Sequence, residues 1–535
     1  MADPDFVFMD GFDKYGPVNT NGEQFIRALN NSGEWSGFQA NSSWDVNYKA
    51  AAPLGSSTGC SLQIYDSDSS LLSLNVYKTV PGNYPRTIGG VYFKSSALNY
   101  IYQVVNFSDV NGNATQLYIA VDTAGKLGVW RGNFAGTRIA TSTYTYVAGT
   151  SIGIEWDITF SSTTGIVKVW IDGVLDINLT GQNTISTANS YFNRIYLGVI
   201  AASITGISAT LNYDHFYLWC YNAAGGTETP IGGGFQVQTS FPIADSTPSQ
   251  FNGRRYLGNY SLLTATGMSS ATDITMTGPF TVPNNCQALG IVWWPNINST
   301  GTYTTYVGIY AESGGSPTTL LAQSVTSTTA ANDPTGLYFD TPLSLTAGSK
   351  FFLAHTINVG SSTAIRSGLG IAPSYRVSRA TFAPLPATAP ALGTSTFSSQ
   401  QAIGIIASGF TGGKFDAVDM NPALPSFVYN YDSVAGDVDA YTFGGLEGSP
   451  TAIYYLALKG VLGRTNTGSR TARLEVDSAG TISAGSLGSF TPAVVGSNQN
   501  GGPIYATYFK NDPATSTAWT NSAAAGIKGR AKVVS

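Results

Sequence analysis

Short runs of β-branched and aromatic residues recur from end to end of this sequence, separated by Gly, Asn, Ser and Pro clusters. Runs such as IGIEWDITF at 152–160 and GIVKVWID at 165–172 have the length of strands. The Asn111-Gly112 pair is typical of a tight hairpin turn. The i, i+3, i+4 apolar pattern of an amphipathic helix is almost nowhere sustained. The sequence therefore predicts an all-β protein of tandem β-sandwiches with very little helix.

The chain of 535 residues is too long for one hydrophobic core, so we expect several domains. The stretch 223–240 is rich in Gly, Thr and Ala without a helical period, which favours a linker. The Pro-rich stretch within 382–400 suits an extended surface segment. Near the C-terminal end, Thr517 or Ser516 could cap a short Ala-rich helix. The expected organisation is a domain at 1–222, the linker at 223–240, and further domains at 241–410 and 411–535.

The composition excludes two classes of partner. Charged residues make up 11% of the chain and the net charge is -5. Such a chain lacks the stripe of basic residues that binding to a phosphate backbone requires. We therefore expect that nucleic acid is not a partner of this chain. No apolar run approaches the roughly 20 residues that span a bilayer, so we expect no membrane insertion. The odd number of irregularly spaced cysteines favours buried thiols over disulfides or zinc ligands at Cys60, Cys220 and Cys286.

The start of the sequence is typical of a strand with both faces covered. Phe6 and Phe8 fall on one face of this extended run, and Val7 and Met9 fall on the other. No basic region, apolar segment and small-residue cleavage site precede the run, so we expect no signal peptide.

The N-terminal third resembles a group of tailed-bacteriophage structural proteins that open with a D-G-F-D-x-Y motif. The stretch 154–181 fits the concanavalin-like (laminin-G-like) lectin sandwich of that group, with a strand that bears Trp156. A second strand there ends in Asp172 and Gly173. The opening motif falls on Asp10, Gly11, Phe12, Asp13 and Tyr15.

The C-terminal block resembles the last domain of phage virion proteins, in which a D-P-x-T-x-x-x-W-T motif precedes a short helix and the final strand. The middle block, with YVGIYAE at 306–312, resembles jelly-roll modules of phage and bacterial surface proteins. The C-terminal motif falls on Asp512, Pro513, Thr515, Trp519 and Thr520.

These resemblances imply a bacteriophage virion structural protein, made in the bacterial cytoplasm and assembled with other virion proteins. They favour a tail-fibre or tail-appendage component that contacts host-surface carbohydrate without catalysis. A capsid decoration protein or head fibre is an alternative, and a polysaccharide-degrading tailspike is a further one. Since virion assemblies have closed rotational symmetry, we expect a homo-oligomer, with a trimer as the first hypothesis.

The sequence carries no recognisable catalytic motif. His215 and His355 each lie in a predicted strand, and neither belongs to a zinc cluster or a nucleophile motif. Glu155 and Asp157 share a face of one predicted strand, so a joint role is open, but they lack the facing arrangement that flanks a scissile glycosidic bond. We therefore expect no catalytic residues and no enzyme.

Calcium is the one ion that the sequence brings into question. Asp109, Asn111 and Asn113 offer clustered oxygens, as does the stretch 66–70, and Ca²⁺ accepts six to eight such ligands. A hairpin and a polar turn explain these stretches without an ion, because neither has the glycine and closing glutamate of an EF-hand. Asp10 and Asp13 are also better explained as capping or hairpin residues. We expect no metal and no other cofactor.

Three tryptophans are candidates for stacking on sugar rings. Trp293 and Trp294 are adjacent on a predicted strand, so their side chains point to opposite faces and one must leave its sheet's core. Trp130, next to Arg131, is a weaker candidate of the same kind. The alternative is burial under a loop or in a subunit interface, where tryptophan is also enriched.

Overall fold

The structure of the chain is a computed structural model. The described residues are 4–12, 34–39, 46–49, 54, 60–65, 73–112, 114–133, 135–200, 209–224, 228–238, 242–249, 252–259, 263–264, 273–282, 285–293, 295–296, 302–329, 335–358, 364–365, 367–368, 374–392, 400–401, 403–408, 430–431, 435, 437–443, 450–464, 470–494 and 504–534. Within these ranges, no helix has the length and apolar character needed to cross a membrane.

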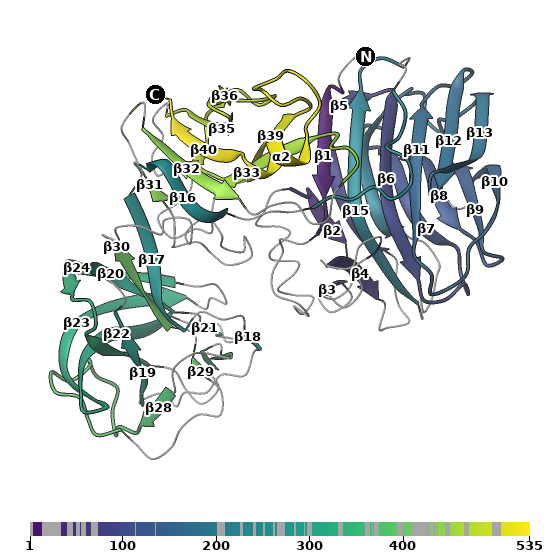
Figure 1. The fold of residues 1–535 in the computed structure, drawn as a ribbon. Helices are drawn as coiled ribbons and strands as arrows, with labels where there is room; N and C mark the ends of the chain where they lie inside the picture. The colour runs from purple at the N-terminus through teal and green to yellow at the C-terminus, as the bar shows by residue number, and fades with distance from the viewer. Residues whose placement is uncertain are drawn as a thin grey trace.

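The N-terminal part forms a sandwich of two antiparallel sheets (Figure 1). The eight-stranded sheet runs in the order β13 (Val174–Gln182), β12 (Gly165–Ile171), β11 (Ile152–Thr159), β6 (Arg86–Ser95), β15 (Thr210–Tyr221), β4 (Ser61–Tyr65) and β3 (Val46–Lys49), and β1 (Phe6–Asp10) also pairs with β15. The seven-stranded sheet runs β10 (Thr137–Thr145), β9 (Lys126–Arg131), β8 (Ala114–Val121), β7 (Tyr102–Asp109), β14 (Phe192–Ile200), β5 (Ser73–Tyr84) and β2 (Gly37–Gln39). The expected all-β sandwich is confirmed.

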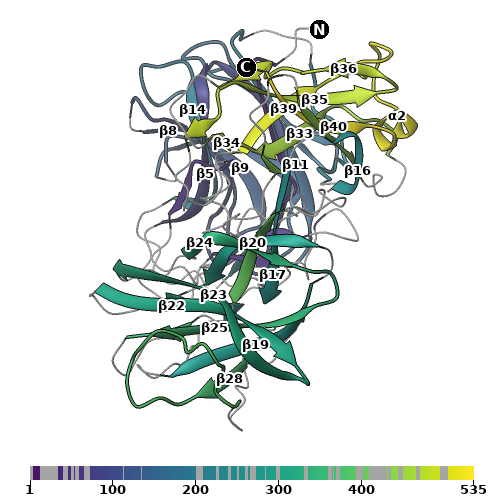
Figure 2. The same ribbon diagram turned by 90° about the vertical axis from the view of Figure 1, so that its left-hand side faces the viewer.

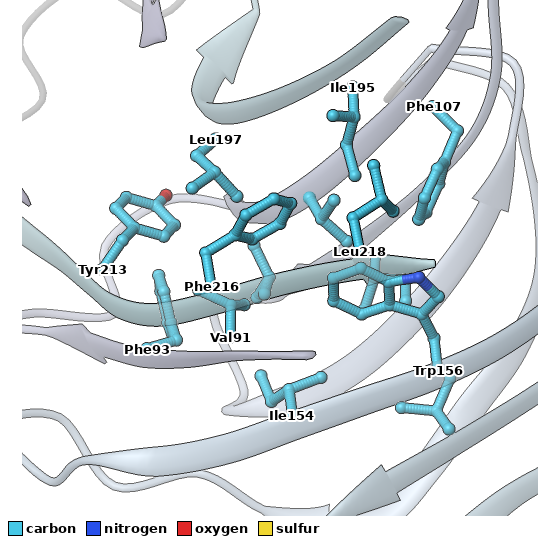
Figure 3. Packing of buried hydrophobic residues seen from close by; sticks show 14 of the residues in the cluster. Val91, Phe93, Phe107, Ile154, Trp156, Ile195, Leu197, Tyr213, Phe216 and Leu218 are labelled. Carbon is cyan, nitrogen blue, oxygen red and sulfur yellow. The ribbon is translucent and has the colours of Figure 1, made fainter. Parts of the chain in front are cut away.

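The core lies between these two sheets, because alternate residues of each strand point inward (Figure 3). Trp156 of β11 is fully buried and meets Phe107 of β7 edge-on at 5.6 Å between ring centroids. An added Cβ on Gly89 would lie 2.4 Å from the Trp156 ring, so glycine is what lets the indole rest on β6. The two sheets are thus joined by interlocking aromatic side chains.

The opening motif organises the N-terminal strand. Asp10 accepts hydrogen bonds from the Phe12 N–H and the Trp35 indole N–H, both at 2.8 Å. Phe12 has a φ of 59° and its buried ring stacks on Trp35. As expected, both faces of β1 are covered, with Val7 7% and Phe8 3% exposed. Asp13 and Tyr15 lie outside the described residues.

The strand expected to end in Asp172 and Gly173 is β12, and these two residues form the turn that connects it to β13. Both residues have positive φ values, 48° and 80°, as the central residues of a type I′ hairpin turn do. The Asp172 carboxylate also accepts a 2.7 Å hydrogen bond from the Gly153 N–H, which ties the turn to β11.

Residues 252–431 contain a second sandwich, seen as a separate lobe in Figures 1 and 2. Its apolar core includes Ile291, Val307, Leu353 and Ile405. One sheet runs β24 (Thr335–Leu345), β20 (Cys286–Trp293), β30 (Ile403–Ser408), β17 (Asn252–Asn259) and β31 (Asn430–Tyr431). The other runs β23 (Ser316–Thr329), β22 (Thr302–Ser313), β25 (Lys350–Ile357), β19 (Ile274–Thr281) and β28 (Ser374–Val377). Shorter pairings join β18 (Leu263–Thr264), β27 (Ser367–Gly368) and β29 (Gln400–Gln401), and β21 (Pro295–Asn296) with β26 (Ala364–Ile365).

The C-terminal sheet draws in a strand from much earlier in the chain. Its order is β16 (Pro242–Ser249), β32 (Val438–Phe443), β40 (Lys528–Val533), β35 (Ala472–Ser478) and β36 (Thr481–Ser483), with β37 (Ser489–Phe490) also on β35. Beside it, β33 (Leu456–Val461) pairs with β39 (Ile504–Phe509), and β34 (Gly463–Arg464) with β38 (Ala493–Val494). Because β16 belongs to this sheet, the boundary expected at residue 241 does not coincide with the division between sheets.

The D-P-x-T-x-x-x-W-T motif shapes the turn before the last strand. Asp512 accepts a 2.9 Å hydrogen bond from the Ala514 N–H, and the Trp519 indole donates to the Phe509 carbonyl at 3.1 Å. The expected helix is α2 (Asn521–Ala525), and its N-cap is Thr520, whose hydroxyl accepts from the Ala523 N–H. Thr517 and Ser516 were the wrong caps, because both belong to the preceding turn: the Asp512 N–H bonds to the Thr517 carbonyl and the Ser516 N–H to the Asp512 carbonyl.

Candidate functional site

The outer face of the eight-stranded sheet is covered by other parts of the chain. Val7 and Trp219 on this face pack with Phe235 of the segment 228–238 and with Tyr455 and Tyr508 of the C-terminal domain. The Trp219 and Tyr455 ring centroids lie 5.4 Å apart. Figure 1 shows β33 and β39 beside β1 and β15, in agreement with these contacts. This face is therefore an internal interface of the chain.

Glu155 and Asp157 lie in this interface and have separate partners. The Tyr217 hydroxyl donates to Glu155 at 2.5 Å, and the Gly232 N–H donates to the same oxygen at 3.1 Å. Asp157 accepts from the Arg86 guanidinium at 2.9 Å. Burial raises the pKa of Glu155, and its hydrogen bonds oppose that shift in part. The two carboxyl groups therefore do not form one acidic cluster, although they share a strand face.

Both histidines are buried in strands. His215 is 3% exposed, and its Nδ1 lies within hydrogen-bond distance of the Val237 backbone, 3.3 Å from its nitrogen and 3.2 Å from its oxygen. Nδ1 also lies 3.6 Å from the Asp214 carboxylate, and Tyr92 contacts the ring edge-on. His355 is 1% exposed on β25 of the middle sandwich.

Acidification is expected to destabilise the chain through His215. Burial lowers the pKa of His215 to about 4, whereas the unfolded residue titrates near 6.5. Between pH 4 and 6.5 the unfolded state binds more protons than the folded state, so the free energy of unfolding falls as the pH falls through this range. Above about pH 6.5 this contribution of His215 is fully present. The total loss on reaching pH 4 is roughly 3 kcal/mol, at 1.36 kcal/mol per pKa unit. Burial likewise lowers the pKa of His355 to about 3, which adds a loss of the same sign at lower pH.

Urea unfolding of the wild type and of His215→Gln at neutral and acidic pH tests this expectation. The variant should lose less stability on acidification, because it removes the residue that gains a proton on unfolding. Glu155 acts in the opposite direction in both proteins, since its raised pKa favours the folded state as the pH falls. Identical pH dependence of the two proteins would contradict the assignment.

The outer face of the seven-stranded sheet carries a continuous cross-strand row of side chains. Its members are direct partners on successive strands, and they alternate with inward-pointing core residues. Adjacent strands lie about 4.8 Å apart, so the seven strands together span roughly 29 Å. From β10 to β5 its side chains are Arg138, Trp130, Tyr118, Asn106, Tyr196 and Tyr77, and Gly37 of β2 is the backbone partner of Tyr77.

At one end of the row, Trp130 lies between Tyr118 and Arg138. The Tyr118 and Trp130 rings are nearly parallel with centroids 5.0 Å apart, and the Arg138 guanidinium lies 4.6 Å from the indole centroid. Arg138 also pairs with Asp122 at 2.7 Å. Trp130 is 5% exposed, so it differs from the open stacking surface that the sequence predicts. Neighbours on the two flanking strands cover the indole.

The same end leaves two buried donors without acceptors. The Tyr118 hydroxyl and the Arg138 Nη2 have no hydrogen-bond partner within the described part of the chain. Buried polar groups normally find a partner, in the protein or in ordered water. These two groups therefore leave hydrogen-bonding capacity beside the stacked rings.

Amide side chains occupy the centre of the face. Asn106 donates to the Thr115 hydroxyl at 3.0 Å and accepts from the Ser108 hydroxyl at 2.8 Å. Gln103, on the same strand face, donates to the Gly198 carbonyl. Asn106 and Gln103 are 2% and 7% exposed. The open parts of the face lie toward its two ends, where Tyr77 and Arg138 are half-buried.

Two of the residues considered for calcium, Asp109 and Asn111, hold a neighbouring loop through hydrogen bonds. Asp109 is buried and accepts hydrogen bonds from the Thr187 hydroxyl at 3.0 Å and the Asn189 amide at 2.7 Å. The Asn111 amide donates to the Tyr191 hydroxyl at 3.2 Å. Asn113 and the stretch 66–70 lie outside the described residues. Among the described residues, no group of three or more His, Cys, Asp or Glu could hold a metal ion.

The sugar-stacking role of the other two candidate tryptophans, Trp293 and Trp294, remains a prediction. Trp293 ends β20 and pairs with Thr335 and Ile403 through the backbone. Its side chain and all of Trp294 lie outside the described residues.

Comparison with known proteins gives distant structural matches only. No family model and no curated protein matches the chain. The alginate lyase Aly36B is 12% identical, with 41% of this chain and 98% of the lyase covered at a TM-score of 0.30. The catalytic domain of a glycoside hydrolase family 131 protein from Coprinopsis cinerea is 14% identical, with 37% and 86% covered at 0.25. A sialidase from Trypanosoma rangeli is 12% identical, with 35% and 29% covered at 0.24.

These matches correct one expectation from the sequence. The expectation that the chain is not an enzyme is contradicted, because the similar structures are glycan-processing enzymes. Likeness at this level assigns no activity or mechanism to the chain. Absence of a recognisable catalytic motif is therefore no ground for excluding catalysis here.

Proposed function

We propose that the chain contacts carbohydrate through the outer face of the seven-stranded sheet, as a tail-fibre or tail-appendage component of a bacteriophage virion. The cross-strand row carries the carbohydrate part of this proposal. It combines aromatic rings, amides and a guanidinium on one face, the set of groups that typically lines a polar ligand site. The opposite outer face of the sandwich is covered by the chain's own C-terminal domain. On the proposed face, Tyr77 and Arg138 toward the two ends are half-buried and therefore within reach of a ligand.

The resemblance of the two terminal motifs to phage structural proteins supports the virion part. Asp10 and Phe12 order the first strand, and Trp519 and Thr520 order the turn and cap before the last one. These residues therefore have structural roles within this chain, and the virion location rests on the resemblance alone.

Tyr77→Ala tests the carbohydrate face. The Tyr77 ring is half-buried and lies tilted against the Tyr196 ring, with the ring centroids 5.5 Å apart, in one of the open parts of the face. Its loss should weaken binding about tenfold, the effect of removing one aromatic contact. Binding is measured by calorimetry against purified capsular polysaccharide and lipopolysaccharide glycans. Dextran and polygalacturonate are tested in the same way, as a neutral and an acidic polymer.

Tyr65→Ala is the matched control, because Tyr65 is 40% exposed at the end of β4 in the other sheet. Equal weakening by both variants, or no binding by the wild type, would contradict the proposed face. The same incubations are assayed for new reducing ends, whose release would assign glycan cleavage to the chain.

Copy number per particle separates the tail appendage from the capsid alternative. Quantitative mass spectrometry of purified virions compares this chain with the major capsid protein. A copy number far below that of the capsid protein is expected for a symmetric tail appendage. A copy number that follows the capsid lattice would favour a decoration protein or head fibre instead.

A further inference from the structure

Arg194 stands on the candidate face in an aromatic cradle. Its guanidinium carbon lies 4.6 Å from the Tyr77 ring centroid and 5.9 Å from that of Tyr196. Nε donates to the Thr79 hydroxyl at 3.0 Å, and Nη1 donates to the Tyr196 hydroxyl at 3.3 Å. These four contacts fix both the plane and the position of the guanidinium.

The charge of Arg194 is not neutralised by a carboxylate within the described part of the chain. Other fixed arginines of this sandwich are neutralised: Arg138 pairs with Asp122 at 2.7 Å, and Arg86 pairs with Asp157 and Glu228 at 2.9 and 3.1 Å. Arg194 differs from them in having only hydroxyl and ring partners.

The cradle is also accessible. Arg194 and Tyr77 are half-buried and Thr79 is exposed, in contrast to the closely packed centre of the row. A guanidinium held flat against a ring keeps its remaining N–H groups in a planar fork, which matches the two oxygens of a carboxylate or sulfate. Holding the fork in place beforehand lowers the entropy lost when an anion binds.

We propose that Arg194 forms an anion subsite for the carboxylate or sulfate groups of an acidic polysaccharide. This inference rests on the proposed function and adds the class of glycan that the face selects. The neutral part of the polymer contacts the half-buried Tyr77 and the exposed Thr79, and the acidic group pairs with Arg194. Recognition of this kind depends on charge and so weakens as salt screens it.

Binding of the full chain to matched polymers tests the subsite. Polygalacturonate is compared with its carboxyl-reduced neutral counterpart, and dextran sulfate with dextran, so that carboxylate and sulfate are distinguished. The wild type should bind at least one acidic polymer about tenfold more tightly than its neutral partner. Arg194→Gln should abolish that preference and its salt dependence, while binding to the neutral polymers is retained.

Two further variants keep the result interpretable. Arg194→Lys preserves the charge but not the fork, so it should recover only part of the preference. Arg131→Gln removes a positive charge from β9 outside the cradle and should leave the preference unchanged. Equal binding of neutral and acidic polymers by the wild type would overturn the subsite and leave the proposed function standing. Absence of binding to all four polymers would count against both.

Discussion

Replacing Trp156 by alanine is expected to lower the free energy of unfolding by about 3–5 kcal/mol. Trp156 is fully buried between the two sheets of the N-terminal sandwich, beside Phe107 and Phe216 (Figure 3). Its ring rests on the backbone at Gly89, which has no side chain to fill the space left behind. The variant therefore leaves a cavity at the point where the sheets are joined.

Trp156→Phe should cost less than the alanine variant. It keeps an aromatic ring and removes the indole N–H, which is buried without an acceptor in the described part of the chain. Loss of an unsatisfied donor offsets part of the lost packing. Val174→Ala is the control, because Val174 is 69% exposed on the edge strand β13 and should change stability by less than about 0.5 kcal/mol.

Urea unfolding of the full chain, followed by hydrogen exchange in peptides from β6, β11 and β15, measures these effects strand by strand. Such resolution is needed because a chain with several domains does not unfold in one transition. Equal midpoints for Trp156→Ala and Val174→Ala would show that the core does not depend on this side chain.

Local patterns predict the strands well because their causes are local. The β11–β12 hairpin follows from its alternating apolar residues, and the β12–β13 turn from the Asp172-Gly173 pair. The pairing of β16 with β32 joins residues almost two hundred positions apart. The local sequence of Pro242–Ser249 does not indicate which strand it will pair with. A boundary placed at residue 241 from composition alone therefore does not reflect this long-range pairing.

The row of side chains on the candidate face could not be predicted from the sequence, for a related reason. Each strand shows that a polar or aromatic residue points outward, as Tyr118 and Asn106 do. Only the register of seven strands places these residues in one row, and bulges shift that register between Gln103 and Val105 and between Arg138 and Ala140. Exposure of Trp130 likewise depends on its cross-strand partners, which its own sequence neighbourhood does not contain. The alternation of inward and outward residues along each strand therefore indicates which residues lie on the outer face. It does not indicate which of them are neighbours across the strands.

Arg86→Met is expected to destabilise the chain by about 3–5 kcal/mol, because it leaves buried carboxylates without a counter-charge. The Arg86 side chain is 4% exposed and holds Asp157 with two nitrogens, at 2.9 and 3.2 Å. It also holds Glu228 at 3.1 Å, and Glu228 belongs to the segment that covers the eight-stranded sheet. The loss should therefore appear both as a lower urea midpoint and as faster hydrogen exchange in residues 228–238.

Two comparisons separate the buried charge from the shape of the side chain. Arg138→Met removes a partly exposed ion pair, with 30% and 15% of the two side chains accessible, and should cost less than about 1 kcal/mol from the pair itself. Adding Asp157→Asn to Arg86→Met removes one of the buried carboxylates that Arg86→Met leaves without a counter-charge. The double variant should therefore recover part of the lost free energy of unfolding. If Arg86→Met and Arg138→Met are equally mild, the carboxylates of Asp157 and Glu228 are solvated in the folded chain, and the segment 228–238 is held by its apolar contacts through Phe235 instead.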